Sequence, residues 1–105
     1  MIVIFEKDYL KELYENGQAN SKKFRFQPQI IKKYTRIIDL MIEVPNVMDL
    51  MRYVGLHYEH LRGDKEGLSS VRINAQYRIE FREIVEDKKS VAEVVGITDL
   101  SNHYK

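Results

Sequence analysis

The chain has 105 residues, of which 44% are hydrophobic, so it is long and apolar enough for one domain, residues 1–105, with its own core. It contains no cysteine, which excludes disulfide bonds, thiolate zinc sites and cysteine nucleophiles. Lys and Arg number 17 against 16 Asp and Glu, and the resulting formal net charge of +1 excludes a polycation that binds nucleic acid through its overall charge.

No segment of the sequence has the length or character of a membrane anchor. The longest apolar runs, such as residues 1–5, are far shorter than the roughly 20 residues that cross a bilayer. The first residues also lack the basic, apolar and small-residue pattern of a secretory leader. We therefore expect a cytoplasmic protein that makes no use of a membrane.

The first quarter of the chain predicts a strand, a helix and a loop. Residues 2–5 are mostly β-branched, which favours a strand at the edge or in the centre of a sheet. Residues 7–16 repeat apolar side chains at helical spacing, and Gly17 supplies a stop. The polar and basic loop that follows contains two apolar side chains, so we expect Phe24 and Phe26 to anchor it to the core.

A second helix is the clearest element of the sequence. Pro28 suits its first turn, and Val44-Pro45 ends it. Between them, apolar side chains recur with the helical period: Ile30, Ile31, Tyr34, Ile37, Ile38 and Met41. Asn46 then caps a short helical turn that Gly55 ends.

From Leu56 onward the apolar period changes from near 3.6 to near 2, which marks the change from helices to a sheet. We expect strands at residues 56–61, 69–74, 77–84 and 90–97. The short connections between them imply an antiparallel meander, because parallel neighbours need long crossovers. The expected fold class is therefore α+β, a two-layer domain with N-terminal helices packed on a mainly antiparallel sheet.

The middle strands alternate apolar and basic side chains, so they divide these between the two faces of the sheet. The apolar face comprises Val71, Ile73, Tyr77, Ile79 and Phe81. The opposite face carries Arg72, Arg78 and Arg82, with Arg62 entering from the preceding strand. Guanidinium groups bind phosphate through paired donors and stack on exposed bases, so we take this face as the working surface.

One alternative for these arginines stays open. Carboxylates on neighbouring strands would neutralise them and leave an ordinary sheet face. The acidic residues in reach are Glu59, Glu80, Glu83 and Glu93.

Between Glu15 and Asp39 the chain carries basic side chains and no acidic one. These candidate RNA-binding residues are Lys22, Lys23, Arg25, Lys32, Lys33 and Arg36. Each phosphate that they neutralise would make binding more sensitive to salt. The alternative is a solvated loop and helix face without a ligand.

The histidines are candidate proton-transfer groups. His57 and His60 are three residues apart, which in a strand places them on opposite faces and makes them a poor metal pair. His103 lies near Asp99 and Tyr104 in a C-terminal tail that could fold back against the arginine face. Its imidazole can take or give a proton near neutral pH, as metal-free phosphodiester cleavage requires. The alternative is an exposed histidine without a role.

Several motifs of other chemistries are missing from the sequence. It has no phosphate loop ending in Lys-Ser or Lys-Thr, no nucleophile elbow, no His-Glu-x-x-His and no carboxylate cluster of the two-metal nuclease type. If the protein cleaves RNA, we expect it to do so without a metal or another cofactor.

Parts of the sequence resemble a known family. Residues 62–67 and 69–81, RGDKEG and SSVRINAQYRIEF, are similar to the central signature of HigB-type toxins in the RelE/ParE superfamily. Residues 94–99, VVGITD, resemble the last strand of that family, and residues 100–104 resemble its C-terminal tail. The resemblance covers roughly residues 56–105, whereas the N-terminal half agrees in the order of its elements.

The resemblance implies a RelE-like fold and the toxin of a type II toxin–antitoxin system. Toxins of this type are sequestered by a HigA-like helix-turn-helix antitoxin, and they meet operator DNA only through that complex. They enter the ribosomal A site and cleave messenger RNA there without a metal, because the 2′-hydroxyl attacks the adjacent phosphate.

By motif position, the resemblance also implies a set of catalytic residues: Arg62, Arg72, Arg78, Asp99, His103 and Tyr104. The arginines would stabilise the phosphate and hold the backbone, with Arg78 foremost. Asp99 would orient His103 for proton transfer, and Tyr104 would stack on a nucleotide. We add His60 and Arg82 as further RNA-binding candidates.

The sequence departs from the family pattern at two places. Many relatives end in Asp-Tyr-His, whereas Leu100, Ser101 and Asn102 intervene here after the aspartate. Glu59, next to His60, stands where many relatives have a histidine. Two other functions stay open: a ParE-like inhibitor of DNA gyrase, and a degenerate toxin that only binds its antitoxin.

Overall fold

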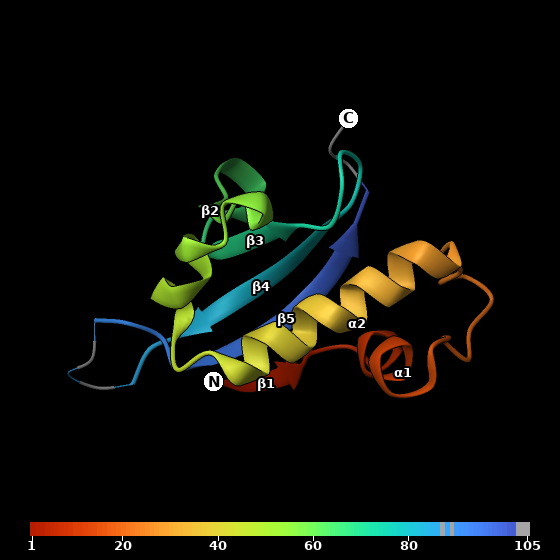
Figure 1. The fold of residues 1–105 in the computed structure, drawn as a ribbon, viewed down its shortest axis with the longest axis horizontal. Helices are drawn as coiled ribbons and strands as arrows, with labels where there is room; N and C mark the ends of the chain where they lie inside the picture. The colour runs from red at the N-terminus through yellow and green to blue at the C-terminus, as the bar shows by residue number, and fades with distance from the viewer. Residues whose placement is uncertain (87, 89, 103–105) are drawn as a thin grey trace.

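The computed structural model describes residues 1–86, 88 and 90–102, and folds them into one sheet with helices on one face (Figure 1). The strands are β1 Ile2–Phe5, β2 Glu59–His60, β3 Leu68–Arg72, β4 Arg78–Ile84 and β5 Val94–Ser101. The helices are α1 Asp8–Asn16 and α2 Pro28–Glu43. Three 3₁₀ turns complete the chain: η1 Val47–Arg52, η2 Val54–Leu56 and η3 Gly63–Lys65. The expected two-layer α+β fold is confirmed.

The sheet has the strand order β1-β5-β4-β3-β2. Each neighbouring pair from β2 to β5 is antiparallel, which confirms the expected meander. β1 is an edge strand and pairs with β5 in parallel. The helices and the meander lie between these two strands in the chain and supply the long connection that a parallel pair needs. The first strand therefore pairs with the last, and residues from the two ends of the sequence become neighbours.

The strand expected at residues 56–61 is much shorter in the structure. β2 contains only Glu59 and His60, because residues 54–56 form η2 and His57 follows with a φ of 46°. A positive φ lies in the left-handed region, which is incompatible with a strand. The expectation that His57 and His60 lie on opposite faces of one strand is therefore wrong.

The strand expected at residues 90–97 is β5, which lies further along the chain at Val94–Ser101. A register shift between β4 and β5 places an extra residue in β5 and reverses the alternation of its side chains. The alternation of apolar side chains is broken at that point, so the strand predicted from the sequence ended too early. Leu100 and Ser101, which we expected in the tail, belong to the sheet.

The core lies between the sheet and the helices. Tyr34 of α2 is fully buried, and its hydroxyl donates a hydrogen bond to the carbonyl oxygen of Leu10 at 2.8 Å. Burial raises the pKa of Tyr34 above its ordinary value. The apolar sheet face is confirmed for Val71, Ile73, Ile79 and Phe81, whereas Tyr77 is only half-buried.

Phe24 and Phe26 anchor the connection between the two helices, as expected. Phe24 stacks on Tyr9 of α1, with ring centroids 3.9 Å apart. Phe26 meets the ring of Tyr77 edge-on at 5.9 Å. These contacts tie the connection to the helical layer and to the start of β4.

Candidate functional site

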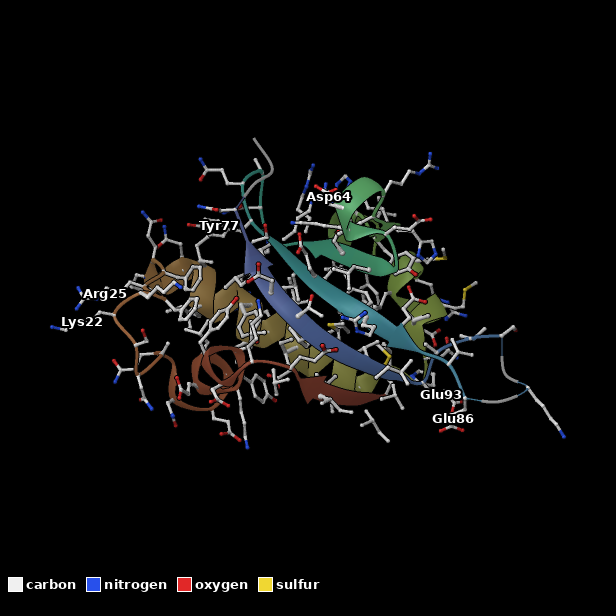
Figure 2. The ribbon with its side chains drawn as sticks, turned by 180° about the vertical axis from the view of Figure 1, so that it is seen from behind. Lys22, Arg25, Asp64, Tyr77, Glu86 and Glu93 are labelled. Carbon is white, nitrogen blue, oxygen red and sulfur yellow. The ribbon has the colours of Figure 1, made fainter. Side chains whose placement is uncertain are left out.

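The candidate site lies on the sheet face that α1 and α2 leave uncovered. This face is turned toward the viewer in Figure 2. Residues directly opposite each other in adjacent strands point to the same side of a sheet. Here Arg72 of β3 lies opposite Arg78 of β4, and Arg78 lies opposite Ser101 of β5. We call these three residues the central row. It brings two of the expected arginines together at one end of the sheet.

Arg78 is the buried centre of this row, with an exposed fraction of only 9%. Its Nη1 lies 2.9 Å from Oε1 of Glu59 and donates to Oγ of Ser70 at 3.2 Å. The side chain of Glu59 is 50% exposed. The guanidinium is thus fixed inside the protein, while the carboxylate that pairs with it remains open to solvent.

Two polar atoms of the central row are buried without a hydrogen-bond partner among the described residues: Nε of Arg72 and Oγ of Ser101. Nη1 of Arg72 lies 3.4 Å from Nε2 of His57, which must be neutral if it accepts this hydrogen bond. A buried donor left unpaired costs about 1–3 kcal/mol. Polar groups without hydrogen-bond partners thus lie on both sides of Arg78, and such groups can donate hydrogen bonds to an anionic oxygen.

Carboxylates pair with two of the arginines, as the alternative interpretation of the sequence allowed. Glu59 pairs with Arg78, and Nε of Arg82 lies 3.4 Å from Oε2 of Glu6. The expectation of a face whose arginines are left open is therefore wrong for these two. Glu6 follows β1 and lies over Gly96 of β5, where a Cβ would collide with its carboxylate. Only the pairing of β1 with β5 makes this contact, and no local pattern predicts it.

Two further carboxylates of the sheet have partners of other kinds. Glu80 is 2% exposed and lies 2.6 Å from Nζ of Lys65. Glu83 accepts hydrogen bonds from the hydroxyl of Tyr58 and from Oγ of Ser69. Burial, and then the hydrogen bond to Glu83, raise the pKa of Tyr58. Glu83 lies on the same side of β4 as the buried Phe81, so the charge pairs of the uncovered face are those of Glu6, Glu59 and Glu80. That face is a network of opposite charges and not a cationic surface.

Asp99 is held in place by α1. The hydroxyl of Tyr9 donates to Oδ1 of Asp99 and accepts from the backbone N–H of Leu100 at 3.0 Å. Nζ of Lys7 lies 4.0 Å from the same carboxylate oxygen. Burial, and then the hydrogen bond to Asp99, raise the pKa of Tyr9. The sequence did not indicate this role of Tyr9, because it predicted only that the residue belongs to a helix.

His103 and Tyr104 lie outside the described residues, so their expected roles stay predictions. The described chain ends at Asn102, directly after Ser101 of the central row. The chain therefore leaves the sheet beside Arg78.

Arg62 and His60 belong to a different part of the surface. Both line a hollow of about 520 Å³ between β2, η3 and β3, together with Ser69 and Glu83. Nδ1 of His60 lies 3.0 Å from Oγ of Ser69 and 3.6 Å from Oε2 of Glu83. Arg72 and Arg78 do not line this hollow, so a role of Arg62 at the same phosphate stays a prediction.

The basic segment does not form one continuous surface. Lys22 and Arg25 line a hollow of about 610 Å³ in the connection between α1 and α2, and they point outward at the tip of that loop in Figure 2. Lys32 faces a second hollow beside α1, and Lys33 and Arg36 line a third one beside β3. Successive side chains on a helix point in different directions, which separates Lys32 from its neighbour.

Two kinds of feature are absent from the part of the chain that the structure describes. No group of three or more His, Cys, Asp or Glu side chains there could hold a metal ion. No helix among these residues is long and apolar enough to cross a bilayer.

The fold is that of the solved YoeB toxins. A solved YoeB/ParE toxin from Agrobacterium tumefaciens superposes with a TM-score of 0.56 at 19% identity, over 99% of this chain and 100% of that one. The YoeB-YefM complex from Staphylococcus aureus superposes with a TM-score of 0.56 at 16% identity, over 99% of this chain and 98% of that one.

Sequence comparison places the chain within this class. The model of the HigB-like toxin family, described as the RelE-like toxin of type II toxin-antitoxin system HigB, matches residues 3–94. Toxin HigB-1 from Vibrio cholerae serotype O1 is 30% identical over 83 residues, which are 78% of this chain and 83% of that protein. An uncharacterised protein from Haemophilus influenzae is 30% identical over 78 residues, 74% of each chain. The chain belongs to the HigB-like toxin family of type II toxin–antitoxin systems.

Proposed function

We propose that this toxin is a metal-independent endoribonuclease that cleaves messenger RNA on the ribosome. The observation that carries the proposal is the central row, in which a buried guanidinium is flanked on both neighbouring strands by buried polar atoms without described partners. Donors that lie side by side on adjacent strands can bind a phosphate together and stabilise the charge that grows on it during cleavage. Membership in the HigB-like family supports the same function.

The proposed reaction is attack of the RNA 2′-hydroxyl on the adjacent phosphorus. The O2′–P bond forms and the P–O5′ bond breaks, which leaves a 2′,3′-cyclic phosphate and a 5′-hydroxyl. Arg78, assisted by Arg72, stabilises the oxygens of the pentavalent phosphate. Glu59, 2.9 Å from Arg78, accepts the proton of the 2′-hydroxyl, and His103 donates a proton to the leaving O5′.

The other expected residues have supporting roles in this proposal. Asp99, fixed by Tyr9, orients His103 for proton transfer. Tyr104 stacks on a nucleotide, and Arg62 holds the RNA backbone from its own hollow.

We also propose that a HigA-like helix-turn-helix antitoxin sequesters the toxin in the cytoplasm, and that the toxin meets operator DNA only through this antitoxin. The family assignment supports an antitoxin partner. A reading frame for a helix-turn-helix protein beside the gene would be the simplest supporting observation, and co-purification of the two proteins would test the complex.

Primer extension on cellular messages after induction of the toxin tests the proposed function. We expect new 5′ ends within translated codons, and we expect Arg78→Ala to slow their formation by about 10²- to 10³-fold. Arg52→Ala serves as the matched control, because Arg52 is exposed and its Nε lies 3.7 Å from Oδ1 of Asp49, in η1. Intact messages with damaged DNA would indicate a gyrase inhibitor instead, and intact messages with intact DNA would indicate a degenerate toxin.

A further inference from the structure

A groove beside the central row has a chemistry that the proposed reaction does not use. It has a volume of about 340 Å³ and lies between α2, the η1–η2 segment and the end of β3. Its lining residues are Lys33, Arg36, Ile37, Leu40, Tyr53, Gly55, Leu56 and Arg72.

The charge of this groove is uncompensated. Its charged lining residues are Lys33, Arg36 and Arg72, and no carboxylate lines it. In the described part of the chain none of the three forms an ion pair, whereas Arg78 and Arg82 on the sheet face each have a carboxylate partner. Cations gathered around one hollow without counter-charges attract an anionic ligand.

The floor and rim of the groove are apolar and include an exposed aromatic ring. Ile37 and Leu56 are buried beneath it, and Tyr53 is 45% exposed at its rim. Tyr53 has no aromatic neighbour among the described residues. An exposed ring beside cations is the combination that binds single-stranded nucleic acid, because bases stack on the ring while the cations hold the phosphates.

The groove and the candidate site share one residue. Arg72 lines the groove and also lies directly opposite Arg78 in the register of β3 and β4. Arg72 would thus be the residue that an RNA strand passes on its way from Arg78 to the groove. This shared residue favours RNA over an acidic peptide, which would match the charge but has no reason to contact a residue of the site.

We propose that this groove binds the single-stranded RNA that flanks the scissile phosphate. Lys33, Arg36 and Arg72 contact successive phosphates, and one base stacks on Tyr53. The inference rests on the proposed function and extends it, because it assigns a path to the substrate beyond the reacting phosphate. It also separates Lys33 and Arg36 from the rest of the basic segment, which faces other hollows.

Binding of a 2′-O-methyl RNA oligonucleotide, measured by fluorescence anisotropy over a range of salt concentrations, tests this path without cleavage. For single strands, each lost phosphate contact lowers the slope of log affinity against log salt by about 0.7, so we expect K33Q/R36Q to lower it by about 1.4. Tyr53→Ala should weaken binding by about 5- to 150-fold, the range for one stacked base, and Tyr53→Phe should restore it.

The control variant K11Q/K88Q removes two cations that are exposed and lie outside the groove, and we expect it to keep the original salt slope. An unchanged slope in K33Q/R36Q, full affinity in Tyr53→Ala, or no binding by the unsubstituted toxin would overturn the inference.

A synthetic acidic amphipathic peptide of Leu and Glu is the second probe. If the groove variants lose the peptide but keep the RNA, the groove is a protein-docking surface. Groove-dependent RNA binding without cleavage of any message would instead refute the proposed function alone.

Discussion

At the scale of single residues, Glu59 is the side chain whose proposed role differs most from the role that the sequence indicated. The sequence presents it as one of several acids that could neutralise an arginine. The structure places its half-exposed carboxylate 2.9 Å from Arg78, beside the buried donors of the central row. A phosphate bound by Arg78 would share this guanidinium with Glu59, so the 2′-hydroxyl next to that phosphate would approach the carboxylate, which makes Glu59 the candidate general base.

Glu59→Gln tests this role, because glutamine keeps the size of the side chain and still accepts a hydrogen bond from Arg78, but it cannot take a proton. We expect single-turnover cleavage to slow by about 10²- to 10⁴-fold, the usual contribution of general base catalysis. Glu43→Gln, an exposed position at the end of α2, is the control and should keep the full rate. Unchanged cleavage by Glu59→Gln would exclude Glu59 as the base.

At the scale of secondary-structure elements, the end of β5 determines the site. The strand continues through Leu100 and Ser101, and this brings Ser101 opposite Arg78. The same extension places Asp99 where Tyr9 of α1 can hold it. Had the strand ended at residue 97, as the sequence suggested, none of these contacts could form.

Leu100→Ala measures whether β5 extends this far. Leu100 is buried, so its truncation should lower the free energy of unfolding by about 2–5 kcal/mol, as for other buried leucines. Asn102→Ala, at an exposed position just after the strand, should change it by less than about 0.5 kcal/mol. Urea unfolding of both variants is the measurement. Equal and small effects would mean that Leu100 lies on the surface and that the register is wrong.

The sequence predicted those elements whose signal is local. The isoleucines of α2 repeat with the helical period, and the apolar positions of β3 and β4 alternate, so these elements and the faces they bury were correct. Contacts between distant segments left no local signal. The pairing of β1 with β5 brings Glu6 to Arg82, and the hydrogen bond of Tyr9 to Asp99 joins residues 90 positions apart.

At the scale of the whole molecule, the net charge of +1 conceals two contrasting groups of cations. Arg78, Arg82 and Lys65, on the uncovered sheet face, each pair with a carboxylate. Lys33, Arg36 and Arg72 gather around one groove without such partners among the described residues. The first group suits a structured reaction centre, and the second suits the binding of a polyanion.

The buried tyrosines predict how the stability of the whole fold depends on pH. Burial raises the pKa of Tyr34 above its ordinary value of 10.0. The tyrosine therefore ionises more easily in the unfolded chain, so its stabilising effect is complete below pH 10.0 and is lost as the pH rises further, by about 1.4 kcal/mol per pH unit. Tyr34→Phe should reduce this alkaline slope by that amount, even though it also loses the hydrogen bond to Leu10. Urea unfolding over the alkaline range checks it, and an unchanged slope would mean that Tyr34 is not buried as described.

The end groups of the cleaved RNA, measured with purified ribosomes and a defined message, test the proposed reaction most directly. Attack by the 2′-hydroxyl predicts a 2′,3′-cyclic phosphate and a 5′-hydroxyl that polynucleotide kinase labels without prior phosphatase treatment. Arg78→Ala should slow formation of these ends by about 10²- to 10³-fold, the usual effect of removing one donor to a developing negative charge. Ends that carry a 5′-phosphate, or an undiminished rate in Arg78→Ala, would contradict cleavage at the central row.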